Sequence, residues 1–258
     1  MLYDAIVTSA HVSDGNVKSV DVYTRSGFST YFSEYFIDCT GDGNLCVQAG
    51  ASFHLGRDDD HLYQPMTLCF WVGNVNKDGF KKILPKINPL YKKFRQEGKI
   101  KNPREDVLVF RHSAPDVLHF NTTRVINLNP TNSEDVTKAQ FIARQQVFEI
   151  YEFLKNNFEC FQKSVLLLTA PEIGVRESRM IDGDYEYTTD DILNYTKFDD
   201  SIACGCYEID IHNPGGTGTH LVYLDRKNYY TIPYRCLIPK GLNNLLVAGR
   251  CISSTHEA

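Results

Sequence analysis

A β-strand that runs directly into two closely spaced glycines is the feature that most constrains this chain. The apolar run Phe36-Ile37-Asp38-Cys39 leads into Thr40-Gly41-Asp42-Gly43, and a short helix is expected over residues 44–49. Glycine tolerates positive φ and lets a ligand approach the backbone closely. A plain strand-to-helix turn would favour the same residues. The local pattern therefore predicts a tight turn that is either structural or ligand-contacting.

The segment before this turn has the pattern of β structure. Asp14-Gly15-Asn16 and Ser26-Gly27 are turn signals, and they separate the apolar or alternating runs 5–12, 17–23 and 31–39. The pattern predicts a meander of three strands, the third of which leads straight into the glycine turn.

The clearest helix is expected over residues 133–158. Thr131 and Glu134 fit a capping box. Apolar residues then recur at steps of three and four, namely Val136, Ala139, Ala143, Val147, Ile150, Leu154 and Phe158. Residues 77–96 also have helical spacing, but Pro85 and Pro89 predict that this helix is broken or shortened.

Further strands are expected at several places along the chain. These are 67–72, 106–111, 117–128, 165–169, 220–224, 229–232 and 245–248. Together with the helices they predict a mixed α+β body with much antiparallel sheet.

Composition narrows the functional classes. The 258 residues are 42% hydrophobic and 23% charged, as in a globular protein, and the net charge of -5 does not favour nucleic-acid binding. No apolar run approaches the roughly 18 residues of a membrane span, and the N-terminal residues lack the pattern of a signal peptide. The eight cysteines contain no C-x-x-C pair, so neither a zinc site nor an iron–sulfur cluster is expected, and a reducing, cytoplasmic location is favoured.

Two arginines stand three residues apart in Gly174-Val175-Arg176-Glu177-Ser178-Arg179. They could form surface ion pairs, or they could present guanidinium groups to a carboxylate or phosphate. Near the C-terminus, the apolar run 245–248 ends in Ala248-Gly249-Arg250, where a ligand could again approach the backbone.

Six strings in one order resemble the FAD-dependent oxidoreductases related to the flavin subunit of heterodisulfide reductase, a branch of the glutathione-reductase-like flavoproteins. They are the D-x-T-G-D-G turn at 38–43, Q-P-M-T-L at 64–68, G-V-R-E-S-R at 174–179, I-D-I-H-N-P at 209–214, I-P-Y-R-C-L-I-P at 232–239 and L-L-V-A-G-R-C-I-S at 245–253. One such string is weak, but six in register are a strong resemblance.

The resemblance implies FAD as the cofactor and an incomplete two-domain flavoprotein fold of the α+β or α/β class. Residues 1–50 and 226–258 are expected to be parts of the FAD-binding Rossmann-like domain. Residues 51–225 are expected to form a mixed, largely antiparallel substrate or cap domain. Family members begin with a G-x-G-x-x-G unit that holds the FAD pyrophosphate and end with a helix that closes over the flavin. Neither occurs in this sequence, so an internal fragment that retains little FAD by itself is expected.

The resemblance also implies roles for individual residues. Thr40, Gly41, Asp42 and Gly43 are expected near the adenosine half of FAD, and Gly249 and Arg250 near the ribityl chain or the flavin. The expected catalytic residues, which hold an anionic substrate or move protons, are Arg176, Arg179, His212, Arg235 and His256.

The expected function is transfer of a hydride or electrons between an organic substrate and FAD. Two alternatives stay open: a non-catalytic truncated remnant, and an electron-transfer flavin subunit whose partner protein carries iron–sulfur clusters.

Overall fold

The computed structural model describes residues 1–258 and contains two compact units. The first unit comprises Met1–Leu62, Glu177–Ile211 and His220–Ala258, and the second comprises Tyr63–Arg176 and His212–Thr219. Each unit has a hydrophobic core of its own, and the first unit has two clusters of buried residues. The functional division at residues 50 and 225 expected from the sequence remains a prediction.

The first unit opens with an antiparallel meander of β1 (Ile6–Ser13), β2 (Asn16–Thr24) and β3 (Gly27–Phe32), as predicted. Asp14 and Gly15 connect β1 to β2 and both have positive φ, of 53° and 72°, as the tight two-residue turns of hairpins require.

The third strand differs from the expected single run over residues 31–39. The strand β3 ends at Phe32, and a separate strand β4 (Phe36–Asp38) pairs in parallel with β15 (Leu245–Val247). The side chain of Asn244 explains the break, because its amide donates to the carbonyl oxygens of Val17 and Glu34 at 2.9 Å each. Tertiary contacts with a residue far along the chain thus divide one apolar run into two strands.

Short elements make up the rest of the first unit. The helices are α1 (Asn44–Gln48), α4 (Thr189–Leu193) and a 3-10 turn at Tyr234–Leu237. The strands β5 (Phe53–Leu55) and β10 (Arg179–Ile181) pair with each other, as do β11 (Ser201–Gly205) and β14 (Tyr230–Pro233), both antiparallel. The strands β12 (Ile209–His212) and β13 (Thr219–Val222) pair with each other. Within each of them the chain passes from one unit to the other, as it also does after Leu62 and after Arg176.

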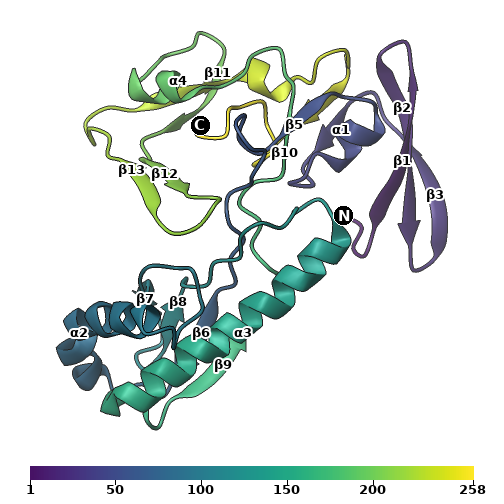
Figure 1. Ribbon diagram of the computed structural model, residues 1–258. Coiled ribbons are helices and arrows are strands. Elements are labelled where there is room, and N and C mark those ends of the chain that lie inside the picture. Colours follow the sequence, from purple (N-terminus) through teal and green to yellow (C-terminus); the bar gives the residue numbers. More distant parts are fainter. The chain divides into compact units, whose positions relative to one another are not determined.

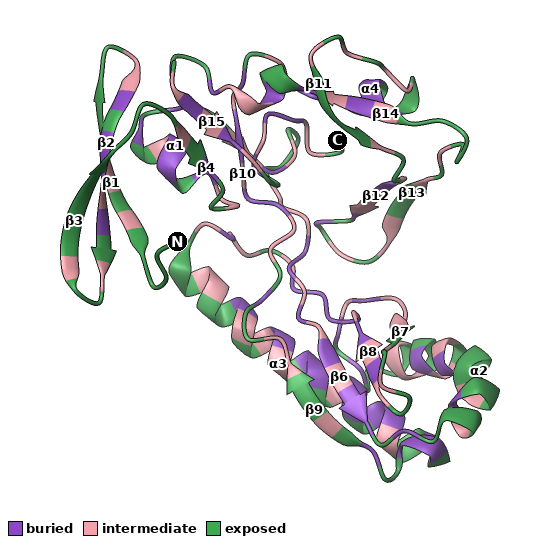
Figure 2. Ribbon diagram, turned by 180° about the vertical axis from the view of Figure 1, so that it is seen from behind, coloured by how far each residue is buried: buried purple, intermediate pink, exposed green.

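The second unit is built on a four-stranded antiparallel sheet in the order β7–β8–β6–β9. Its strands are β7 (Val109–Arg111), β8 (Leu118–Phe120), β6 (Phe70–Gly73) and β9 (Val165–Thr169). The long helix α3 (Ser133–Asn157) runs beside β6 and β9 (Figure 1), and a 3-10 turn at Glu159–Phe161 follows it. The central strand β6 is largely buried (Figure 2), so this sheet and its helices share one core.

Helix α3 has the predicted apolar face, but its N-terminal cap is Asn132. The Asn132 side-chain oxygen accepts from the backbone N–H groups of Glu134 and Asp135 at 2.9 and 3.0 Å. The predicted capping box of Thr131 and Glu134 is therefore wrong, because the Thr131 hydroxyl donates to Asn129 instead. Threonine and asparagine can both cap a helix, and the contact of Thr131 with Asn129 leaves Asn132 as the cap.

Helix α2 (Lys77–Gln96) is continuous, so the predicted break at Pro85 and Pro89 is wrong. The two prolines stand four residues apart and are both exposed, so they lie on the solvent-facing side of the helix. The carbonyl groups that lose their intrahelical partners there can bond water, while Phe80, Ile87 and Tyr91 are buried on the other side.

The architecture as a whole is mixed α and β, with small, mostly antiparallel sheets and few helices. No helix has the length and apolar character needed to cross a membrane.

Candidate functional site

The turn after β4 is organised by Asp38, a buried carboxylate that the sequence analysis did not single out. One of its oxygens accepts from the Thr40 N–H and the other from the Cys46 N–H in α1, both at 2.9 Å. The Thr40 hydroxyl in turn accepts from the Asn44 N–H at 2.9 Å. An acidic residue ending an apolar strand just before a glycine turn is the sequence signal that could have identified it. Asp38 thus ties the turn to the start of the helix.

The parallel pairing of β4 with β15 places two glycine-containing turns side by side. Val247 lies opposite Asp38, and the Ala248 N–H donates to the Asp38 carbonyl at 2.9 Å. Gly249 and Arg250 follow directly. The structure therefore brings together all six residues predicted to lie near the cofactor. The carboxyl ends of parallel strands are where α/β folds commonly bind ligands.

The glycines of this region have different surroundings. Gly41 has φ of +80°, and a Cβ atom there would lie 2.8 Å from Arg250 Nη1. The Arg250 guanidinium forms an ion pair with Asp42 at 2.6 Å, which joins the two turns. Gly249 has φ of +98°, and a Cβ atom there would meet nothing within 4 Å. Protein packing thus accounts for glycine at position 41, whereas the Gly249 backbone presents open space to a ligand.

Arg179 supports the same turn. Its Nη1 donates to the Asp42 carbonyl and to Asn44 Oδ1, both at 2.9 Å, and its guanidinium lies over the Phe53 ring at 5.5 Å. The neighbouring Ser178 hydroxyl donates to the Gly41 carbonyl at 3.4 Å. Arg179, predicted to be catalytic, is placed by these bonds as a residue that positions the glycine turn.

Glu177, one position earlier in the same run, forms a buried pair with His256. The distance from His256 Nδ1 to Glu177 Oε1 is 2.7 Å, and the two side chains are 8% and 5% exposed. A carboxylate only accepts hydrogen bonds, so His256 Nδ1 carries a proton. His256 Nε2 is buried and has no hydrogen-bond partner. The pair therefore resembles the orienting acid and base of many catalytic sites.

His256 lines a groove of about 500 Å³ on the first unit. The walls carry three threonines and several carboxylates, together with His54 and Arg57. His54 is itself held, because its Nδ1 lies 3.2 Å from Asp182 and its Nε2 lies 3.2 Å from the Ser254 carbonyl. The carboxylates that line this groove are Asp58, Asp59, Glu186, Asp190 and Glu257.

His212 lies in the second unit, among arginines. Its Nδ1 accepts from Arg124 Nη2 at 3.1 Å and is 3.4 Å from Arg104 Nη1. Burial, together with the charges of Arg176, Arg104 and Arg124, lowers the pKa of His212 from 6.5 to about 3. His212 is therefore a neutral acceptor at physiological pH.

Arg124 was missed by the sequence analysis, although a charged residue within the run 117–128 was a possible signal. Its side chain is 1% exposed. It donates to the carbonyl oxygens of Gly216 and Gly218 at 3.1 and 2.9 Å and lies 3.4 Å from Glu105. These contacts hold the loop 212–219 onto the second unit, so the arginine cluster has a structural function there.

Arg235 is placed on the surface of the first unit. It forms two hydrogen bonds with Asp200, at 3.0 and 3.4 Å, and lies over the Tyr185 ring at 5.1 Å. The predicted catalytic residues are divided between the two units: Arg179, Arg235 and His256 belong to the first, and Arg176 and His212 to the second.

Comparison with known proteins identifies a family for the whole chain. A model of the family described as FAD dependent oxidoreductase matches residues 1–258, the whole chain. No curated protein matches the chain. The family is FAD dependent, as expected from the resemblance of the six strings. On the strength of this match along its full length, the chain belongs to the FAD-dependent oxidoreductase family.

Proposed function

We propose that this chain provides part of the FAD site and a proton-accepting site for the oxidation of a small organic donor. The observation that carries the proposal is the buried Glu177–His256 pair, in which His256 Nε2 has no protein partner. It lies in the same unit as the two glycine turns, and Ser178 and Arg179 connect the segment of Glu177 to the first of them.

The residues of the two turns fit FAD as the cofactor. The open backbone at Gly249 allows a close approach, and Arg250 supplies a cation next to it. The parallel pair of β4 and β15, with α1 after β4, supports assignment of residues 1–50 and 226–258 to a Rossmann-like FAD domain. Residues 51–225 would then contribute the substrate side. Thr40, Gly41, Asp42 and Gly43 would hold the adenosine half of the cofactor.

The proposed reaction is the oxidation of an alcohol or amine. FAD held at the two glycine turns would supply the oxidant for the hydride that leaves the carbon atom of the donor. The O–H or N–H proton of the donor passes to His256 Nε2, which requires that this buried atom become accessible from the groove, and a C=O or C=N bond forms. Glu177, at 2.7 Å, stabilises the imidazolium produced by this transfer. The donor thus loses one hydride and one proton, which is a two-electron oxidation.

The charge of the groove favours a particular kind of donor. Five carboxylates line it, and Arg57, its only arginine, is already paired with Asp60 at 2.6 Å. An anion would be repelled there, so the donor is neutral or cationic and carries several hydrogen-bonding groups. Arg176 remains a proposed stabiliser of negative charge that develops during the reaction.

FAD binding tests the cofactor part of the proposal. Gly249→Ala adds one methyl group where we infer that the cofactor approaches, and we expect it to weaken FAD binding at least about tenfold, through steric exclusion and altered φ. Titration of the purified protein with FAD, followed by flavin fluorescence, measures the dissociation constant.

Gly27→Ala is a matched control. Gly27 has φ of +104° and, like Gly249, has nothing within 4 Å of an added Cβ, so the backbone strain is comparable. It lies in the β2–β3 hairpin, away from the paired turns. Equal FAD affinity of the two variants would contradict the assignment.

A further inference from the structure

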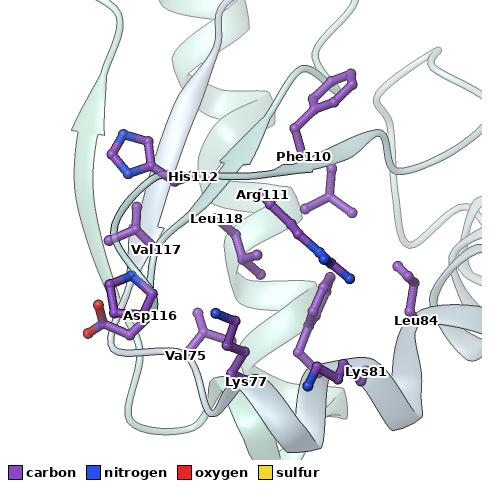
Figure 3. A pocket seen from close by; sticks show the side chains of 13 residues that line it. Val75, Lys77, Lys81, Leu84, Phe110, Arg111, His112, Asp116, Val117 and Leu118 are labelled. Atoms are coloured by element: carbon purple, nitrogen blue, oxygen red, sulfur yellow. The ribbon is translucent and has the colours of Figure 1, made fainter.

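The second unit contains a partly enclosed pocket between helix α2 and the strands β7 and β8 (Figure 3). Its volume is about 150 Å³. Val75, Phe80 and Leu118 line it and are 4%, 7% and 7% exposed. An apolar cavity of about this size accommodates a benzene molecule. The interior therefore suits one apolar group of the size of an aromatic ring.

Three cationic side chains surround this apolar interior. Lys77 and Lys81 come from the first turns of α2, and Arg111 comes from β7. Figure 3 shows the Arg111 side chain extending toward the helix that bears the two lysines. Lys81 is paired with Asp78 at 3.3 Å, whereas Lys77 and Arg111 form no ion pair. The only carboxylate in the lining is Asp116.

From this combination we infer that the pocket binds an amphipathic organic anion, with an aromatic-sized apolar group inside and a carboxylate at the cationic rim. The interior removes the apolar group from water, and the guanidinium and ammonium groups supply charge-assisted hydrogen bonds. The inference is independent of the redox proposal, because the glycine turns and the Glu177–His256 pair belong to the other unit.

Helix α2 is basic along its length, with six lysines and one arginine against one aspartate, so its lysines alone do not define a site. The further cation, Arg111, comes from strand β7 and borders the same cavity. Lys86, on the same helix, is exposed and does not line the pocket. The positive charges at the pocket instead converge from a helix and a strand on one apolar cavity, which is the usual composition of a site for a small organic ligand.

The sole tryptophan of the chain provides a direct measurement. Trp71 contacts His112, one of the residues that line the pocket, with ring centroids 4.6 Å apart. Phenylacetate, phenylacetamide and acetate are the probes, and both tryptophan fluorescence and isothermal titration calorimetry report binding to the full chain. We expect phenylacetate to bind at least about tenfold more tightly than its neutral amide, and acetate to bind more weakly than either.

Variants of the cationic residues test where the carboxylate of the ligand binds. Arg111→Gln and Lys77→Gln should each weaken phenylacetate binding about tenfold without changing the affinity for phenylacetamide. Lys86→Gln is the matched control on the same helix and should bind like the wild type. Equal affinity for phenylacetate and its amide, loss of affinity in Lys86→Gln alone, or no binding of phenylacetate would each overturn the inference. The probe series needs no variant, so a misfolded variant does not prevent this test.

Discussion

His212 and His256 are the same residue type in two buried settings of opposite charge. His212, in the second unit, accepts from Arg124 and is surrounded by positive charge that keeps it neutral. His256, in the first unit, donates to the buried carboxylate of Glu177 and has its other nitrogen free of any partner. A positive charge is disfavoured at the first histidine, whereas the second lies against a carboxylate.

The difference shows how surroundings determine the chemistry available to one side chain. A histidine whose charged form is excluded can accept a hydrogen bond and position a loop, but it cannot hold a proton during a reaction. A histidine oriented by a carboxylate can accept a proton and keep it. Both residues were equal candidates in the sequence, and we propose His256 as the proton acceptor because it pairs with a carboxylate.

We expect the largest effect on stability when Arg124, one of the arginines close to His212, is replaced. Arg124→Met removes a fully buried guanidinium together with its hydrogen bonds to the carbonyl oxygens of Gly216 and Gly218 and its ion pair with Glu105. We expect the free energy of unfolding to fall by about 3 kcal/mol or more, measured by urea denaturation. Arg235→Met, at an exposed ion pair, is the control and should change stability little. Similar losses in the two variants would refute the structural role of the cluster.

The next effect concerns His256. His256→Asn removes the proton acceptor, and we expect turnover by the FAD-loaded protein to fall by about 100-fold or more. Bound flavin and melting temperature should stay close to those of the wild type, because the turns that we assign to FAD are unchanged. His11→Asn, at an exposed histidine paired with Asp21, is the control. Turnover per bound flavin equal to that of the wild type would exclude His256 as the base.

A pH dependence of stability follows from His212. In the unfolded chain this side chain binds a proton below about pH 6.5, whereas in the folded protein it stays neutral until about pH 3. The unfolded state therefore binds more protons in this window, and stability falls as the pH falls, by at most about 1.4 kcal/mol per pH unit.

His212→Asn should flatten that slope between about pH 6.5 and pH 4.5, above the range in which most carboxylates titrate. The asparagine oxygen can still accept a hydrogen bond near the Nδ1 position. Chemical denaturation of both proteins at several pH values gives the two slopes. Identical slopes would show that His212 is protonated in the folded protein as readily as in the unfolded chain.

The smallest effect is expected at the ion pair that joins the glycine turns. Asp42 and Arg250 are 27% and 35% exposed, so solvent screens their attraction. Arg250→Gln should lower the free energy of unfolding by less than about 1 kcal/mol. It should weaken FAD binding more clearly, since the cation lies beside the proposed approach at Gly249. A large loss of stability with unchanged FAD affinity would make Arg250 a structural residue like Arg124.

Several elements followed from local pattern alone. The hairpin at Asp14-Gly15, the apolar face of α3 and the glycine turn after Asp38 were predictable, because each depends on residues close together in the chain. Predictions failed where distant contacts decided the outcome. Asn244 ends a strand more than 200 residues earlier, and the exposed position of Pro85 and Pro89 lets α2 continue through both of them.

The sequence by itself determined the family, the FAD dependence that accompanies it and the two glycine turns, because these are recorded as contiguous strings of residues. Only the tertiary structure decided which charged residues meet. Glu177 and His256 are 79 residues apart, and Arg124 and His212 are 88 apart, so no local pattern could pair them. Protonation depends on distance, burial and neighbouring charge, and these quantities exist only after the chain has folded.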